Sequence, residues 1–158
     1  MLDHIGLCEW LRRVTGNPHL ASCRELFGTA NPFVHMTSAI RYPTFFKGKN
    51  YSGSPDPLNS PLLREIIDTI LRREVQQLRD AIFVPLGDTV ASVFEYLRVE
   101  DTRVLFGLPH PSGANRERIN YFLDKKPRHL LSSKTNPVKI DAARKRLQAK
   151  VVELLSDD

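Results

Sequence analysis

The sequence predicts a single α/β domain, spanning residues 1–158, in which helices cover a short parallel sheet. Three observations support this prediction. Short apolar runs of strand length alternate with longer runs whose apolar residues recur at helical spacing, an alternation typical of parallel sheets. The length suits one domain with its own core. Proline, glycine or polar residues follow each strand-like run, at the sheet edge where ligands bind.

The first half of the chain is expected to contain two helices, with a strand and a long loop between them. Apolar residues at helical spacing predict a helix over residues 5–14. Residues 31–40 resemble a short buried strand, and residues 41–59 form a loop rich in proline, glycine and aromatic residues. Ser60 as N-cap and Pro61 in the first turn then begin a longer helix. Its predicted apolar face consists of Leu63, Ile66, Ile67, Ile70, Leu71, Val75 and Leu78.

The second half continues the alternation of strands and helices. In order, the expected elements are a strand at 81–87, a helix capped by Asp88, a strand at 103–108, a helix at 115–123 and a helix at 138–155. A basic connection precedes the last helix. Four cations of that helix are expected to face solvent, namely Arg144, Lys145, Arg146 and Lys150.

The charge and cysteine content restrict the possible functions. The net charge is +5, and residues 98–158 hold the whole excess, because residues 1–97 carry ten basic and ten acidic side chains. A basic half suits a nucleic acid, although +5 is also an ordinary charge for solubility. Two cysteines are too few for a four-thiolate metal site, so we expect reduced thiols and a cytoplasmic protein without a metal. We also expect no membrane span and no secretion leader.

The segment after the last predicted strand carries the clearest candidate site. His110 follows the strand on a turn stiffened by proline, where a neutral imidazole can donate a hydrogen bond to developing negative charge. Ser112, with the backbone amides of Gly113 and Ala114, suits a phosphate group, and Arg116 adds positive charge. The structural alternative is a capped helix preceded by an exposed histidine.

Three segments resemble the uracil-DNA glycosylase superfamily, and they follow one another along the chain in the same order as in that superfamily. The run His110-Pro-Ser-Gly-Ala-Asn-Arg116 resembles its second signature motif, in which His-Pro-Ser precedes a segment that enters the duplex. The run Ile82-Phe-Val-Pro-Leu-Gly-Asp-Thr-Val-Ala91 is similar to an upstream strand of that superfamily. The run Val34-His-Met-Thr-Ser-Ala-Ile-Arg-Tyr-Pro43 is similar to the strand that ends near its base-reading position.

This resemblance implies a three-layer α/β/α fold and excision of uracil, or a related damaged base, from DNA. The target base would leave the stack, and His110 would donate a hydrogen bond to uracil O2 while the glycosidic bond breaks. The resemblance assigns Pro111, Ser112 and Gly113 to the phosphates, and Ala114, Asn115 and Arg116 to the wedge. Arg118 would be a further phosphate contact. Such enzymes need DNA as partner and no cofactor.

The sequence departs from the superfamily pattern at the base-reading position. There the superfamily usually presents an asparagine, whereas Ser38 is the nearest match here. Thr37 and Met36 are alternatives under a shifted register, and Asn50 in the long loop is a substitute. A hydroxyl lacks the paired donor and acceptor face of an amide, which weakens uracil selection.

The first superfamily motif, which positions the attacking water, is absent, and so is the first strand. Asp3 and His4 lie near the missing place, but we interpret them as residues of a first helical turn. The sequence therefore predicts an N-terminally incomplete chain, or a sheet completed by a partner chain.

Three functional hypotheses follow. The first is a glycosylase-like domain whose catalysis requires the missing motif. The second is a non-catalytic module that binds nucleic acid or another partner. The third is an unrelated α/β enzyme that holds a phosphorylated small molecule at Ser112.

Overall fold

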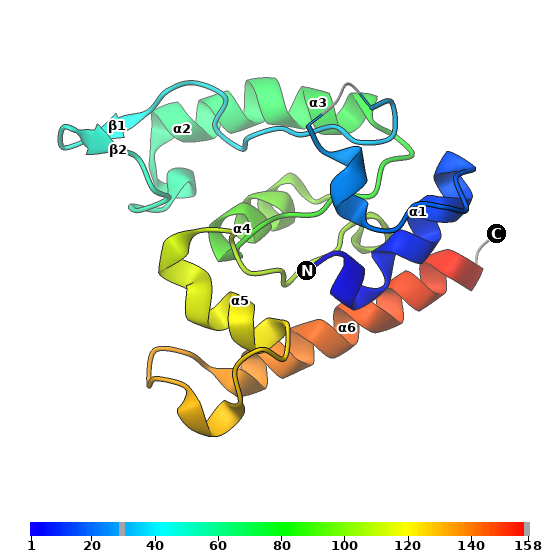
Figure 1. The fold of residues 1–158 in the computed structure, drawn as a ribbon. Helices are drawn as coiled ribbons and strands as arrows, with labels where there is room; N and C mark the ends of the chain where they lie inside the picture. The colour runs from blue at the N-terminus through cyan, green and yellow to red at the C-terminus, as the bar shows by residue number, and fades with distance from the viewer. Residues whose placement is uncertain (29–30, 157–158) are drawn as a thin grey trace. The chain divides into compact units, whose positions relative to one another are not determined.

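Helices dominate the computed structural model, which describes residues 1–28 and 31–156 (Figure 1). The chain divides into two compact units. The first unit comprises Met1–Met36 and Phe106–Asp158, and the second comprises Thr37–Leu105. No helix among the described residues is both long enough and apolar enough to cross a bilayer.

The first unit is built on one long helix, α6 (Pro137–Ser156), which contacts α1 (Leu7–Thr15) and α5 (Arg116–Phe122) (Figure 1). Short 3-10 helices lie at Asp3–Ile5, Cys23–Leu26, Gly113–Asn115 and Arg128–Leu130. Side chains with helical spacing fill the core because each helix turns one apolar face inward. The buried residues include Ile5, Leu7, Leu11, Leu20, Leu108, Phe122, Ile140, Ala143, Leu147 and Val151.

The N-terminal turn of this unit holds a neighbouring segment in place. Asp3 accepts hydrogen bonds from the Ser22 hydroxyl and from the Cys23 amide, both at 2.7 Å. Asp3 and His4 lie in a 3-10 turn directly before α1, in keeping with the first-turn interpretation. Cys8 and Cys23 are free and buried, as expected for two reduced thiols.

The second unit combines a small hairpin with helices. The hairpin strands are β1 (Phe45–Phe46) and β2 (Lys49–Asn50), and the helices are α2 (Pro61–Ile66), a π-helical segment (Ile67–Leu71), α3 (Arg72–Gln77) and α4 (Asp88–Leu97). Short 3-10 helices lie at Pro57–Asn59 and Asp101–Arg103. The core includes Leu63, Ile67, Leu71, Val75, Val93, Phe94, Leu97, Val104 and Leu105.

The π-helical segment explains which apolar residues of the long helix are buried. Leu63, Ile67, Leu71 and Val75 are the buried members of the predicted apolar face, and they are spaced four residues apart. A four-residue repeat drifts around a regular α-helix, which has 3.6 residues per turn. The wider π turn offsets this drift and keeps the four side chains on one face. The predicted N-cap is confirmed, since the Ser60 hydroxyl accepts the Leu63 amide at 3.4 Å.

The predicted three-layer α/β/α fold, with a parallel sheet lacking its first strand, is wrong. The sheet that the described residues form is two-stranded and antiparallel, in the segment predicted as a loop. Of the predicted strands at 81–87 and 103–108, isolated bridge residues remain, among them the parallel bridge between Phe83 and Val104. The Phe83 amide donates to Arg103 O at 2.7 Å, and the Leu105 amide donates to Phe83 O at 2.8 Å.

Proline and glycine explain why this bridge does not grow into a sheet. In a parallel ladder the next donor after Phe83 would be residue 85, and Pro85 has no N–H. On the other side, Gly107 has a φ of +115°, which is incompatible with a continuing strand. Residues 31–40 form no strand. There the Asn31 side chain accepts the Phe33 amide at 2.9 Å and forms a turn instead. Asp88 is not the N-cap of α4, since Gly87 occupies that position.

Candidate functional site

The segment His110–Arg116, here called the motif turn, forms a tight exposed corner in the first unit. Leu108 is buried, whereas His110 and Pro111 are exposed. The Ser112 amide donates to the carbonyl of His110 at 2.8 Å, which closes the corner. The 3-10 turn Gly113–Asn115 then leads directly into α5. The sequence was therefore right about a turn followed by a helix, although no strand precedes it.

Hydrogen bonds run from the motif turn along α5. The Asn115 side-chain amide donates to the Ser112 hydroxyl at 3.1 Å, and Arg118 donates to Asn115 Oδ1 at 3.0 Å. Arg118 also donates to the carbonyl of Lys134 at 3.3 Å. The guanidinium of Arg118 therefore orients Asn115 and holds a distant loop. This contact gives the side chain a structural role besides the predicted phosphate contact.

The loop that Arg118 holds consists of residues 124–136 and is called here the basic loop. Glu117 of α5 is its main anchor. The Glu117 carboxylate accepts hydrogen bonds from Lys126 Nζ at 2.6 Å, from the Ser132 hydroxyl at 2.6 Å and from the Thr135 hydroxyl at 2.5 Å. The Lys126 contact, followed by those of Ser132 and Thr135, lowers the pKa of Glu117 from 4.5 to about 2. The carboxylate thus stays charged and keeps the loop attached to α5.

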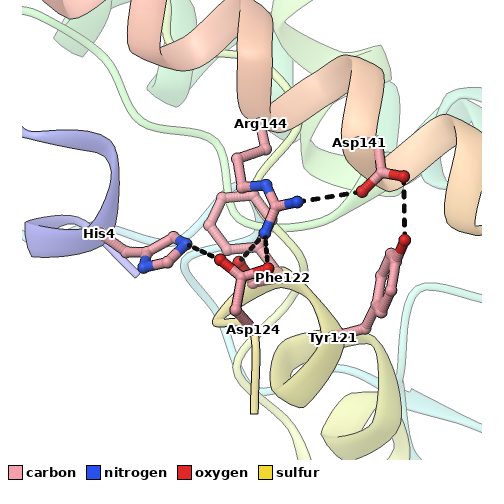
Figure 2. Close-up of polar contacts among 6 residues, drawn as sticks. All are labelled: His4, Tyr121, Phe122, Asp124, Asp141 and Arg144. Carbon is pink, nitrogen blue, oxygen red and sulfur yellow. Dashed lines mark hydrogen bonds and ion pairs between the residues drawn. The ribbon is translucent and has the colours of Figure 1, made fainter. Parts of the chain in front are cut away.

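A second polar cluster fixes the start of the basic loop (Figure 2). Arg144 of α6 pairs with Asp124, and it donates to the carbonyl of Phe122 at 3.2 Å and to Asp141 at 3.1 Å. His4 Nε2 lies 3.3 Å from the other oxygen of Asp124. Arg144 was predicted to face solvent, and this prediction is wrong because its guanidinium is mostly covered and joins α6 to the end of α5. Figure 2 also shows Tyr121 donating to Asp141, at 2.9 Å.

These anchors leave cations on the surface of the first unit. The exposed lysine and arginine side chains of the motif turn, the basic loop and α6 include Arg116, Lys125, Arg128, Lys134, Lys145 and Arg146. By contrast, three of the four acidic side chains between residues 106 and 156 lie in the ion pairs described above. The cations of this region therefore outnumber its carboxylates, most of which are paired, and this balance favours an anion.

Ser38 and Thr37, the predicted base-reading residues, belong to the second unit, whereas the motif turn belongs to the first. Ser38 is exposed. The Thr37 hydroxyl donates to Glu74 at 3.1 Å and accepts from Arg41 at 3.4 Å, so it belongs to an ion-pair network. Asn50 lies in β2. Met36 belongs to the first unit and lines a shallow depression of about 540 Å³ that does not include His110. The structure thus groups the DNA-contact candidates of the motif turn within the first unit.

One group of described residues has the atoms for a metal site. Single ligand atoms of Asp3, Cys8 and Cys23 lie within 4.8 Å of one another. Burial, together with the hydrogen bond to Asp3, raises the pKa of the Cys23 thiol, which disfavours the thiolate that a metal needs. The Cys8 thiol donates to the carbonyl of Leu20 at 3.6 Å. These contacts place the two buried thiols in a packed corner of the first unit.

Sequence reasoning missed the anchors of the basic loop. Glu117, Lys126 and Thr135 are ordinary charged and polar residues in the sequence, and no local spacing links them. One signal was available. Asn136 followed by Pro137 is a helix start, and the Asn136 side chain accepts the Lys139 amide at 3.1 Å. That signal would have fixed the end of the basic loop at the correct residue.

Comparison with known proteins adds a distant relative. The chain is 34% identical over 113 residues to YoxB of Bacillus subtilis (strain 168), which is described as an uncharacterized protein. The match covers 68% of this chain and 44% of YoxB, so the chain spans less than half of that relative. No family model matches the chain. No solved structure matches it significantly.

Proposed function

We propose that this chain binds nucleic acid and contacts the phosphate backbone with the basic loop and the motif turn of its first unit. The observation that supports this proposal most directly is the attachment of the basic loop to α5. Glu117 and Arg118 hold the loop at several points along its length, and its own cations Lys125, Arg128 and Lys134 are exposed. A fixed row of cations suits a polyanion because little conformational entropy is lost on binding.

Charge balance in the same region supports the proposal. Residues 106–156 contain eleven lysine or arginine residues and four aspartate or glutamate residues, an excess of seven positive charges. Most of the four acids are already neutralised in ion pairs. A DNA backbone carries regularly spaced charges, and a protein that neutralises several of them releases counterions. The binding should therefore be sensitive to salt and tolerant of sequence. We further propose that the chain acts in the cytoplasm, where its two free thiols remain reduced.

Fluorescence anisotropy with labelled duplex and single-stranded oligonucleotides tests the proposal. Three phosphate contacts correspond to a slope of roughly −2.7 in a plot of log affinity against log salt for duplex DNA. A variant with Lys125, Arg128 and Lys134 all changed to alanine should flatten the slope by about 2.7 and weaken binding to all sequences alike.

The matched control is Arg24→Ala, which removes an exposed cation from the 3-10 helix Cys23–Leu26 of the same unit. This variant should leave the salt slope of the chain unchanged. If Arg24→Ala loses as much affinity for DNA as the single variants Lys125→Ala and Lys134→Ala, the loss reflects only the general charge of the chain. An unmodified chain without affinity for DNA at low salt would refute the proposal.

Base excision is the second candidate function, and the resemblance of the motif turn to the second motif of the uracil-DNA glycosylase superfamily supports it. The imidazole is exposed on a corner between Pro109 and Pro111, and the Ser112 amide closes this corner. A ring carried on such a stiff corner can be aimed at a base with little loss of freedom. The resemblance to the uracil-DNA glycosylase superfamily supplies the chemistry, a hydrogen bond to the departing uracil O2. This role does not require the predicted parallel sheet.

A single-stranded oligonucleotide with one uracil tests the second candidate, with strand cleavage in alkali as the readout. Activity that His110→Ala abolishes and His129→Ala preserves would support excision. His129 is the matched control, since it is exposed in the basic loop of the same unit. Salt-sensitive binding without cleavage would support the binding function alone.

A further inference from the structure

The β1–β2 hairpin of the second unit exposes aromatic rings to an unusual degree. Phe45 is 67% exposed, Phe46 is 44% exposed, and Tyr42, just before the hairpin, is 57% exposed. Single exposed apolar residues are common, but large rings gathered on one short segment mark interaction sites. The fold therefore displays these rings on a hairpin and not in its core.

The hairpin is a defined structure. Phe45 pairs with Asn50 and Phe46 pairs with Lys49, and a two-residue turn joins them. Both turn residues have positive φ, +50° at Lys47 and +72° at Gly48, as in the tight turns that match the twist of a hairpin. The Tyr51 amide donates to Thr44 O at 2.9 Å and extends the pairing beyond the strands. The rings are thus carried on a pre-shaped support.

Cations lie on the same segment as the rings. Residues 41–55 include Arg41, Lys47 and Lys49 and contain no aspartate or glutamate. Arg41 is paired with Glu74, which leaves the exposed Lys47 and Lys49 to give the hairpin its charge. Lys47 Nζ lies 5.4 Å from the centre of the Phe46 ring. Aromatic faces next to cations match an unpaired nucleotide, which offers a flat base and a phosphate a short distance apart.

We propose that the β1–β2 hairpin stacks on unpaired bases of single-stranded nucleic acid, while its lysines contact the adjoining phosphates. This inference rests on the proposed nucleic-acid binding and assigns to the second unit a preference for unpaired bases. An apolar protein partner would not need the exposed lysine that lies beside the Phe46 ring. In a regular duplex the base faces are covered by stacking, so the hairpin should discriminate against paired DNA.

The test compares three probes on the full chain: oligothymidylate, the same backbone with abasic sites, and a duplex of equal length. Phe45→Ala should weaken binding of oligothymidylate by about 5- to 100-fold, the range for loss of one stacked base. Binding of the abasic strand should be unchanged, because that strand offers phosphates without bases. An oligonucleotide with one 2-aminopurine reports stacking directly, and its fluorescence quenching should disappear in Phe45→Ala.

Leu62→Ala is the matched control, since Leu62 is 66% exposed on α2 of the same unit. Circular dichroism confirms that both variants are folded. Equal affinity of Phe45→Ala and the unmodified chain for oligothymidylate would overturn the inference, as would equal affinity of the unmodified chain for abasic and base-bearing strands. In either case the proposed function would stand if the alanine variant of the basic loop still lost binding. Preferential binding of anionic vesicles through Phe45 would overturn the inference in favour of a lipid surface.

Discussion

The two surfaces proposed for nucleic acid differ in how the protein holds them. The basic loop of the first unit has little secondary structure, yet the carboxylate of Glu117 and the guanidinium of Arg144 tie it to two helices. The hairpin of the second unit has regular backbone pairing over two residues in each strand, and its rings face solvent. One surface is therefore fixed by side-chain contacts, and the other mainly by its own backbone.

This difference indicates where each surface is vulnerable. The basic loop depends on packing and charge elsewhere in the first unit, so changes distant from its cations should disturb it. The hairpin depends on local turn geometry, so only nearby changes should alter its shape. The predictions below test this contrast.

The largest effect is expected from Phe122→Ala. Phe122 is fully buried at the end of α5, and its carbonyl accepts from Arg144. Truncating a buried phenylalanine leaves a cavity and should lower the free energy of unfolding by about 3–5 kcal/mol. Trp10, the only tryptophan, lies in α1 of the same unit, so its fluorescence during urea unfolding reports the loss.

The control for this change is Leu130→Ala in the basic loop. Leu130 is exposed, and its truncation should alter the free energy of unfolding by no more than about 0.5 kcal/mol. A Trp10 transition that Phe122→Ala does not shift would contradict the view that α5 packs into the same core as α1.

Gly107→Ala should produce the next largest effect. A Cβ at this position would lie 2.8 Å from the Cβ of Ala143 in α6, and the backbone φ of +115° is strained for any residue with a side chain. Overpacking and backbone strain together should destabilise the first unit by about 2–4 kcal/mol.

Gly16→Ala provides the comparison for Gly107→Ala, since Gly16 also has positive φ but no atom within 4 Å of a new Cβ. Gly16→Ala should lower the free energy of unfolding by about 1 kcal/mol, because only the left-handed backbone is unfavourable for alanine there. Thermal unfolding of both variants separates the steric contribution from the backbone contribution. Equal losses of stability in Gly107→Ala and Gly16→Ala would refute the close approach of Gly107 to α6.

The helices were predictable from the sequence because their signals are local. The Ser60–Pro61 start and the apolar spacing after it gave the long helix almost residue by residue. The strands were not predictable in this way. The run at 81–87 has the composition of a buried strand, and whether it forms a sheet depends on partners distant in sequence. Pro85 and Gly107 were visible, but their effect on a ladder becomes clear only when Phe83 is placed beside Val104.

The candidate site was predicted in part for the same reason. The motif turn at His110 and Ser112 depends on a contiguous run of residues, so its corner and the following helix were found from the sequence. The basic loop depends on Glu117 meeting Thr135, eighteen positions away, and single-sequence patterns do not encode such a pair. The role of Ser38 as a base reader stays a prediction.

Glu117→Gln should produce a smaller effect that depends on pH. The folded-state pKa of Glu117 is lowered from 4.5 to about 2, so the carboxylate contributes stability at pH values above its unfolded pKa. This contribution should be complete above about pH 5 and should vanish as the pH falls from 4.5 toward 2. The melting temperatures of the variant and the unmodified chain should therefore converge in acid.

Glu153→Gln is the control for Glu117→Gln, because Glu153 is an exposed carboxylate on α6. Trypsin should also cut the basic loop of Glu117→Gln faster than that of the control, since Lys126 and Ser132 lose their charged acceptor. A difference in melting temperature that persists unchanged below pH 3 would show that the Glu117 charge does not anchor the loop.

Lys47→Asn should have the smallest effect on stability, and it should raise stability where the other variants lower it. Lys47 has a φ of +50° in the hairpin turn, a conformation that asparagine adopts more readily than lysine. The exchange should stabilise the second unit by about 0.5 kcal/mol, at the low end of the cost of such strain. The same exchange removes one of the two exposed cations of the hairpin, so it should weaken binding of single-stranded DNA and reduce the salt slope by about 0.7. Stability and binding would then move in opposite directions, as expected if the lysine is retained for its charge. An exchange that raises stability without affecting binding would show that the hairpin turn does not contact the ligand.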